Sequence, residues 1–180
     1  MAHSTMSNYV ALLRGINVSG QKIIKMEDLK KIFESLKFEN VKTYIQSGNV
    51  IFESKESNLE ILTIKIEKFL KAKLGYEVTV IIRTMEKMKE IVACNPFKKN
   101  KDKDAKPYVT FLSKKPEYIK IPLVSNDKSV EVFSIIDYDA FSLSRKVKGK
   151  SGFPNSFLES KLKIHATTRN WNTVSKIASF

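Results

Sequence analysis

The sequence predicts an α+β fold in which a ferredoxin-like βαββαβ half is packed with a second, weaker α+β copy and a C-terminal helix. Short apolar runs rich in β-forming residues alternate with longer segments whose apolar residues recur at helical spacing. Between residues 8 and 83 these segments follow the order strand, helix, strand, strand, helix, strand, which is that of a split βαβ motif. We therefore expect one half over 6–83 and another over 84–180, either separate or joined in one compact unit.

The elements of the first half follow from local patterns. Tyr9–Leu13 is short and apolar, which predicts a buried strand, and residues 26–36 carry apolar side chains at helical spacing. Val41–Gln46 and Asn49–Glu53 are predicted strands joined by a tight turn. A second helix, with Ser57 and Glu60 as a capping box, and a strand at 77–83 complete the half.

The second half begins with a helix that Thr84 can cap and Pro96 ends. An irregular or short helical crossover is expected over 116–123. A further helix opens at Pro154, and a final helix is predicted to start at Thr168. Strands are expected at 108–112, 130–136 and 138–144.

Polar residues cluster where two predicted strands meet. In a βαββαβ sheet the first and third strands are antiparallel neighbours, so the end of one lies beside the start of the other. Glycines there allow amide groups to face an anion, and an arginine can clamp it. The alternative is that the glycines only form turns while the asparagines bond local backbone. The residues concerned are Arg14, Gly15 and Asn17 from one segment and Gln46, Ser47, Gly48 and Asn49 from the other.

The start of the last helix offers a third segment. Thr167 or Thr168 can cap it, but Arg169 then falls in the first turn, where the helix dipole disfavours a cation. An anionic ligand shared by Arg169, Asn170 and the helix amides would resolve this conflict. A structural pair with an acidic residue of the chain would resolve it equally well.

The formal net charge of +13 favours a polyanionic partner such as nucleic acid. A lysine-rich composition set by genome base bias is the competing explanation, because only four of the 32 basic residues are arginine.

Two nucleotide-binding motifs fit poorly. Lys22 falls one position late for a phosphate loop that begins at Gly15. In an RNA-recognition module, Ser47 and Asn49 would occupy the positions of the aromatic residues that stack on bases.

Metal and thiol chemistry lack the necessary residues. Cys94 is the single cysteine and is expected to be a buried, inert thiol on a helix, and His165 is expected to have a structural role. We therefore predict no metal site and no cofactor, and no catalytic residue can be named. Whether the protein is an enzyme stays open.

The cytoplasm is the expected location. The sequence has no run of eighteen apolar residues, no secretory signal and no lipidation motif, so no membrane partner is expected. Residues 1–5 show no pattern and are interpreted as an artificial leader before Met6.

Three long motifs closely resemble a bacterial family catalogued as domain of unknown function 1697. They are Tyr9–Gly20, Thr43–Val50 and Thr167–Val174, and with Asn95-Pro96-Phe97 they extend the resemblance over 9–177. The resemblance implies an α+β fold with ferredoxin-like halves and no established activity. Family members also have a glycine-rich basic loop before the penultimate helix, and Gly149-Lys150-Ser151 resembles it only in part.

These observations lead to a hypothesis of anion binding. The first hypothesis is an uncharacterised intracellular protein that binds a phosphorylated small molecule at the polar cleft. Nucleic-acid binding, or an enzyme of unknown reaction that uses the same cleft, is the alternative. The oligomeric state stays open.

Overall fold

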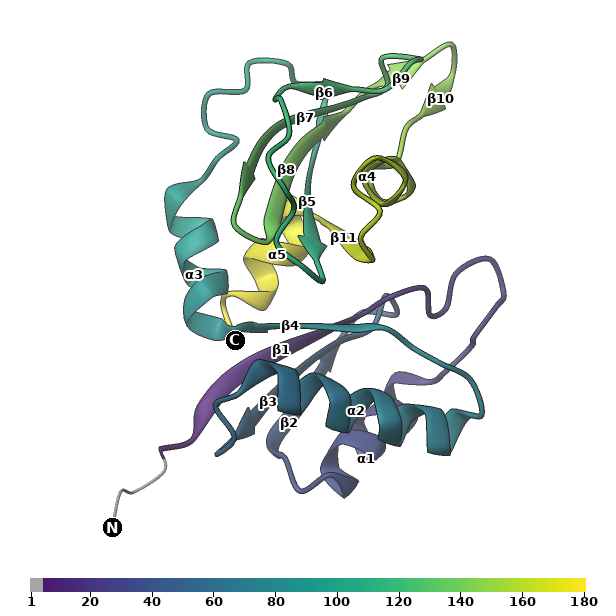
Figure 1. Cartoon of the computed structure of the whole chain (residues 1–180), viewed down its shortest axis with the longest axis vertical. Coiled ribbons are helices and arrows are strands. Elements are labelled where there is room, and N and C mark those ends of the chain that lie inside the picture. Colours follow the sequence, from purple (N-terminus) through teal and green to yellow (C-terminus); the bar gives the residue numbers. More distant parts are fainter. Residues whose placement is uncertain (1–4) are drawn as a thin grey trace. The chain divides into compact units, whose positions relative to one another are not determined.

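The computed structural model describes residues 5–180, so residues 1–4 of the proposed leader lie outside the described residues. The chain divides into two compact units. The first unit comprises the chain up to Glu90 together with Ile177–Phe180, and the second comprises Ile91–Lys176. Both units are α+β, and each has its own antiparallel sheet (Figure 1).

The first unit has the predicted βαββαβ order. Its sheet has the strand order β2-β3-β1-β4 with antiparallel pairing, which is the ferredoxin-like arrangement. This confirms the predicted fold class. The elements are β1 (Ser7–Leu13), α1 (Met26–Ser35), β2 (Glu39–Tyr44), β3 (Asn49–Ser54), α2 (Leu59–Leu74) and β4 (Val80–Thr84).

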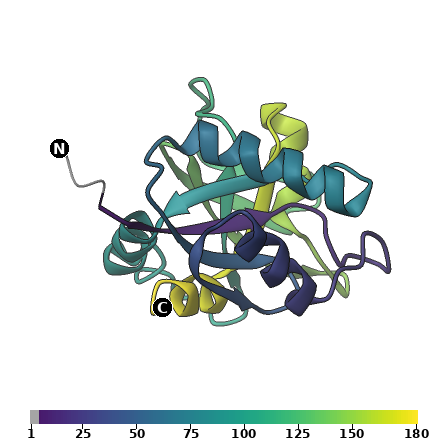
Figure 2. The same cartoon turned by 90° about the horizontal axis from the view of Figure 1, so that it is seen from below.

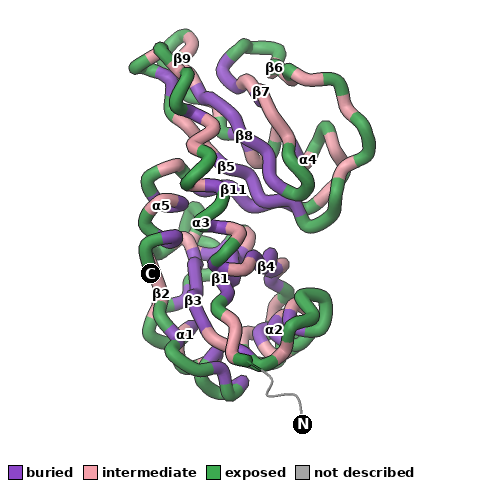
Figure 3. Tube along the Cα trace, turned by 90° about the vertical axis from the view of Figure 1, so that its left-hand side faces the viewer, coloured by how far each residue is buried: buried purple, intermediate pink, exposed green. Residues whose placement is uncertain are grey.

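Both helices of this unit cover the same face of the sheet (Figures 1 and 2). Side chains alternate along a strand, so every second residue of β1 faces the helices and joins the core with Phe33, Phe52 and Leu62. The rings of Phe33 and Phe52 are 5.6 Å apart. β1 is central, and its remaining apolar residues are buried as well, so the whole strand after Asn8 is buried (Figure 3). This explains why its sequence is a continuous apolar run.

The predicted capping box of α2 is wrong. Asn58 caps the helix instead, because its Oδ1 accepts hydrogen bonds from the backbone N–H groups of Glu60 (2.9 Å) and Ile61 (3.2 Å). The helix begins at Leu59, so the preceding residue, and not Ser57, occupies the capping position. At the other end Gly75 takes the left-handed conformation that commonly ends helices.

The second unit repeats the topology of the first, but β6 is added at the edge of its sheet and no helix corresponds to α1. Its sheet has the order β11-β5-β8-β7-β6 with antiparallel pairing, and the first four strands match the order of the other sheet. An irregular segment over 113–122 stands where the first unit has α1, because Pro116, Pro122 and scattered lysines give no helical apolar face. The elements are α3 (Met85–Cys94, across the unit boundary), β5 (Lys106–Leu112), β6 (Leu123–Val124), β7 (Val130–Ile136), β8 (Asp139–Ser144), β9 (Lys146–Val147), β10 (Lys150–Ser151), α4 (Pro154–Leu162), β11 (Ala166–Asn170) and α5 (Trp171–Ile177).

Two predictions for this unit are wrong. Residues 166–170 form a strand and not the start of the last helix, since they pair with β5 and the hydroxyls of Thr110 and Thr168 lie 2.8 Å apart. The β-branched Thr167 and Thr168 fit a strand well. Their partner strand, β5, is distant in sequence, so no local pattern indicates the pairing. Cys94 is exposed and not buried, at the last residue of α3.

Candidate functional site

The end of β1 lies beside the start of β3, as the topology requires. Leu12 pairs with Asn49, and the N–H of Leu13 donates to the carbonyl oxygen of Gly48 at 2.9 Å. On the other side, the N–H of Arg14 donates to the carbonyl oxygen of Thr79 at 2.9 Å. The backbone of Arg14 is therefore fixed at a point where three chain segments meet.

Asn17 connects the loop after β1 to the β2–β3 hairpin. Its Nδ2 donates to the carbonyl oxygens of Gln46 (2.8 Å) and Ile24 (3.0 Å), and its Oδ1 accepts from the N–H of Ile24 at 2.8 Å. Its φ of +52° lies in the left-handed region, which asparagine tolerates better than most residues. The side-chain amide of Asn17 thus bonds backbone groups, so its role here is structural.

Asn49 and Gly48 also have structural roles. Asn49 is fully buried, and its Nδ2 donates to the carbonyl oxygen of Tyr44 (2.8 Å) and to Ser47 Oγ (3.1 Å), which closes the hairpin. Gly48 has a φ of +78°, and a Cβ placed on it would lie 2.4 Å from Cδ1 of Ile16. The alternative interpretation of these residues, as turn formers that bond local backbone, is the one their contacts support.

Arg14, Gly15, Gln46 and Ser47 give this end of the sheet its polar surface. Arg14 and Ser47 are half-buried, whereas Gly15 and Gln46 are exposed. The segments 14–22 and 44–49 contain no carboxylate. The carboxylate of Glu77 also borders this region, because Lys22 Nζ donates to the carbonyl oxygen of Glu77 at 2.8 Å and interacts with its charge.

Arg169 and Asn170 belong to the second unit. Arg169 is buried on β11, where its Nη1 donates to Thr167 Oγ1 (2.7 Å) and to the carbonyl oxygen of Thr168 (2.9 Å). Burial lowers the pKa of Arg169 to about 10. Asn170 caps α5, since its Oδ1 accepts from the N–H of Thr173 at 2.8 Å. The cap is therefore Asn170 and neither of the two threonines.

Other candidate chemistry finds little support. His165 is exposed just before β11, and its carbonyl oxygen accepts a hydrogen bond from the N–H of Ser113 at 2.9 Å. Within residues 5–180, no group of three His, Cys, Asp or Glu side chains is arranged to hold a metal ion.

No helix in the described part of the chain is long and apolar enough to cross a membrane.

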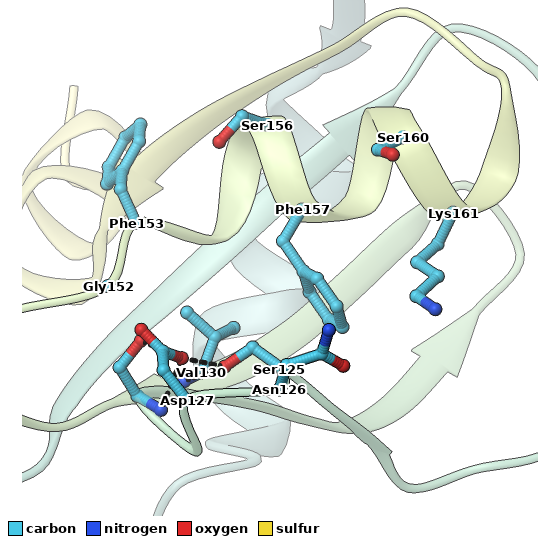
Figure 4. A pocket seen from close by; sticks show the side chains of 11 residues that line it. Ser125, Asn126, Asp127, Val130, Gly152, Phe153, Ser156, Phe157, Ser160 and Lys161 are labelled. Carbon is cyan, nitrogen blue, oxygen red and sulfur yellow. Dashed lines mark hydrogen bonds between the residues drawn. The ribbon is translucent and has the colours of Figure 1, made fainter. Parts of the chain in front are cut away.

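The second unit contains a groove that the sequence did not predict. It has a volume of about 570 Å³ and lies between α4 and the turn that joins β6 to β7 (Figure 4). The two segments are far apart in sequence, and only the uniformly polar composition of 125–129 indicates a polar surface there. The lining residues are Ser125, Asn126, Asp127, Ser129, Val130, Gly152, Phe153, Ser156, Phe157, Ser160 and Lys161.

Asp127 organises the turn at one end of this groove. Its Oδ1 accepts hydrogen bonds from Ser125 Oγ (2.6 Å), Ser129 Oγ (2.7 Å) and the N–H of Ser129 (3.0 Å). These bonds lower the pKa of Asp127 to about 2. A Cβ on Gly152 would lie 2.2 Å from Ser129 Oγ, so only glycine lets the chain pass this close to the turn.

Comparisons with known proteins extend the structural description. A family model described as "Protein of unknown function (DUF1697)" matches residues 6–141. The solved structure of the conserved bacterial protein SP0830 from Streptococcus pneumoniae is similar, with 21% sequence identity and a TM-score of 0.71. The alignment covers 97% of this chain and 98% of that chain, which shows a shared fold over nearly the full length. No match was found among curated proteins.

Proposed function

The chain belongs to the DUF1697 family of proteins of unknown function, and from this premise we propose that it binds a phosphorylated small molecule. The anionic group lies at the polar end of the first sheet, beside Arg14 and the loop that follows it. The net charge of +13 favours an anion over a cation at an exposed surface.

The main support for this proposal is the loop that directly follows Arg14, which has an unusual backbone conformation. Gly15, Asn17, Ser19, Gly20 and Lys22 all have positive φ, so successive amides point in directions that regular structure does not provide. Within residues 5–180, the N–H groups of Gly15, Ser19 and Gly20 donate to no acceptor. These donors suit the oxygens of a phosphate, while Asn17 holds the loop in place through its bond to Gln46.

Titration of the isotopically labelled protein with pyrophosphate, followed by NMR, tests this proposal. The amide resonances of Gly15, Ser19 and Gly20 are expected to move together and saturably. Arg14→Gln should weaken binding at least tenfold, which corresponds to about 1.4 kcal/mol, because a charge-assisted hydrogen bond is lost.

Lys99→Gln is the matched control, since it removes the same charge from an exposed position in the other unit. If both variants weakened pyrophosphate binding equally, or if only the resonances of other residues shifted, the proposed site would be wrong.

Nucleic acid is the competing partner, because the same positive charge attracts a polyanion. A single-stranded oligonucleotide contacts many phosphates, so its affinity should fall by orders of magnitude over a few-fold rise in salt. Tight, strongly salt-dependent oligonucleotide binding without saturable pyrophosphate binding would favour nucleic acid over the small molecule.

A further inference from the structure

We propose that the groove between α4 and the β6–β7 turn is a second ligand site, which takes a short peptide with free termini. Its N-terminal ammonium would bind Asp127 and its C-terminal carboxylate Lys161, with an apolar side chain against Phe157. This proposal is independent of the anion site, because the groove lies entirely within the second unit.

Asp127 provides a fixed negative charge at one end. Three donors converge on its Oδ1, which holds the carboxylate in one orientation and keeps it ionised at physiological pH. None of these three bonds goes to its Oδ2, which can accept one from a ligand. The carboxylate is exposed, so a ligand can reach it.

Lys161 provides a positive charge at the other end. It is exposed and makes no ion pair with the described residues. Phe157 and Lys161 are four residues apart, which places them on one face of α4 with an offset of about 6 Å along the axis. Figure 4 shows the ring of Phe157 between Lys161 and the turn that carries Asp127, with both side chains directed from the helix toward the turn.

The separated charges select the ligand class. A ligand with only negative charge would be repelled by Asp127, and one with only positive charge would be repelled by Lys161. A free amino acid carries its two charges on adjacent groups, whereas Figure 4 shows the ring of Phe157 between the two charged side chains of the groove. A peptide of two or three residues with an apolar side chain matches both the charges and the apolar middle.

Binding of the tripeptide Ala-Phe-Ala to the full-length protein, measured by NMR titration, tests the proposal. N-terminal acetylation removes the ammonium and should weaken binding to the wild type about tenfold, but it should have no effect on binding to Asp127→Asn. C-terminal amidation should likewise weaken binding to the wild type about tenfold and have no effect on Lys161→Gln.

Lys163→Gln is the matched control, because it removes a charge just beyond the end of α4 and should leave the effect of amidation intact. If Asp127→Asn fails to fold, the two peptide derivatives and the Lys161→Gln variant still test whether the groove binds both peptide termini. Equal affinity of all three peptides for the wild type, or no shift of groove resonances at millimolar peptide, would overturn the proposal. Tighter binding of free phenylalanine than of the tripeptide would also overturn it.

Discussion

The side-chain Nδ2 of Asn17 donates a hydrogen bond of 2.8 Å to the carbonyl oxygen of Gln46, 29 residues away in sequence. The same amide group bonds both the N–H and the carbonyl oxygen of Ile24. One side chain thereby fixes the β1–α1 loop against the β2–β3 hairpin. The loop proposed to bind an anion is held in place by this contact.

Replacing Asn17 should destabilise the first unit. Asn17→Ala removes three hydrogen bonds and places alanine at a φ of +52°, so we expect a loss of about 2–3 kcal/mol in the free energy of unfolding. Urea denaturation measures this loss in the free energy of unfolding. Asn17→Gly removes the same bonds without the backbone strain and should cost less. A loss below about 0.5 kcal/mol for Asn17→Ala would contradict a structural role.

Gly48→Ala should be more destabilising than Gly20→Ala. Both glycines have φ above +70°, but an added Cβ meets Ile16 Cδ1 at 2.4 Å only at Gly48, and nothing within 4 Å at Gly20. We expect about 1 kcal/mol from backbone strain at Gly20 and a further 1–3 kcal/mol from overpacking at Gly48. Thermal unfolding of both variants provides the comparison. Ile16→Val removes the closest atom, so in the Gly48→Ala background it should recover part of the loss.

The stability of the second unit should depend on the ionisation of Asp127. Hydrogen bonds from Ser125 and Ser129 lower its pKa from the ordinary 3.8 to about 2 in the folded protein. A depressed pKa means that the stabilisation is complete above about pH 4 and is lost as the pH falls toward 2. The carboxyl carbon of Asp127 should therefore titrate with a midpoint near pH 2 by NMR. A midpoint at the ordinary value would contradict these hydrogen bonds.

Cys94 should react readily in the native protein, because its side chain is exposed at the end of α3. An aromatic disulfide reagent should label one thiol per chain at a rate within a few-fold of that in denaturant. Cys94→Ser should abolish labelling and leave the unfolding temperature nearly unchanged, since no core contact is lost. Labelling that requires denaturation would show that the thiol is protected.

Local patterns in the sequence were sufficient to predict the fold class, the element order of the first half and the family. Hydrophobic periodicity located β1, α1 and β3 to within a few residues, because each has a buried face whose spacing is a local property. The same order predicted that Arg14 and Asn49 would lie in adjoining segments, which the pairing of Leu12 with Asn49 confirms. The family match over 6–141 confirms the resemblance in Tyr9–Gly20 and Thr43–Val50, whereas the third motif, Thr167–Val174, lies beyond the matched residues.

The contacts that these residues make depend on the tertiary structure. Thr168 and Arg169 were assigned to a helix because their strand partners Thr110 and Val109 lie nearly sixty residues away, beyond any local pattern. The groove at Asp127 depends on Gly152 passing the turn at close range, which no spacing reveals. Local propensity is a property of neighbours along the chain, whereas pairing, burial and cavities depend on residues that folding brings together.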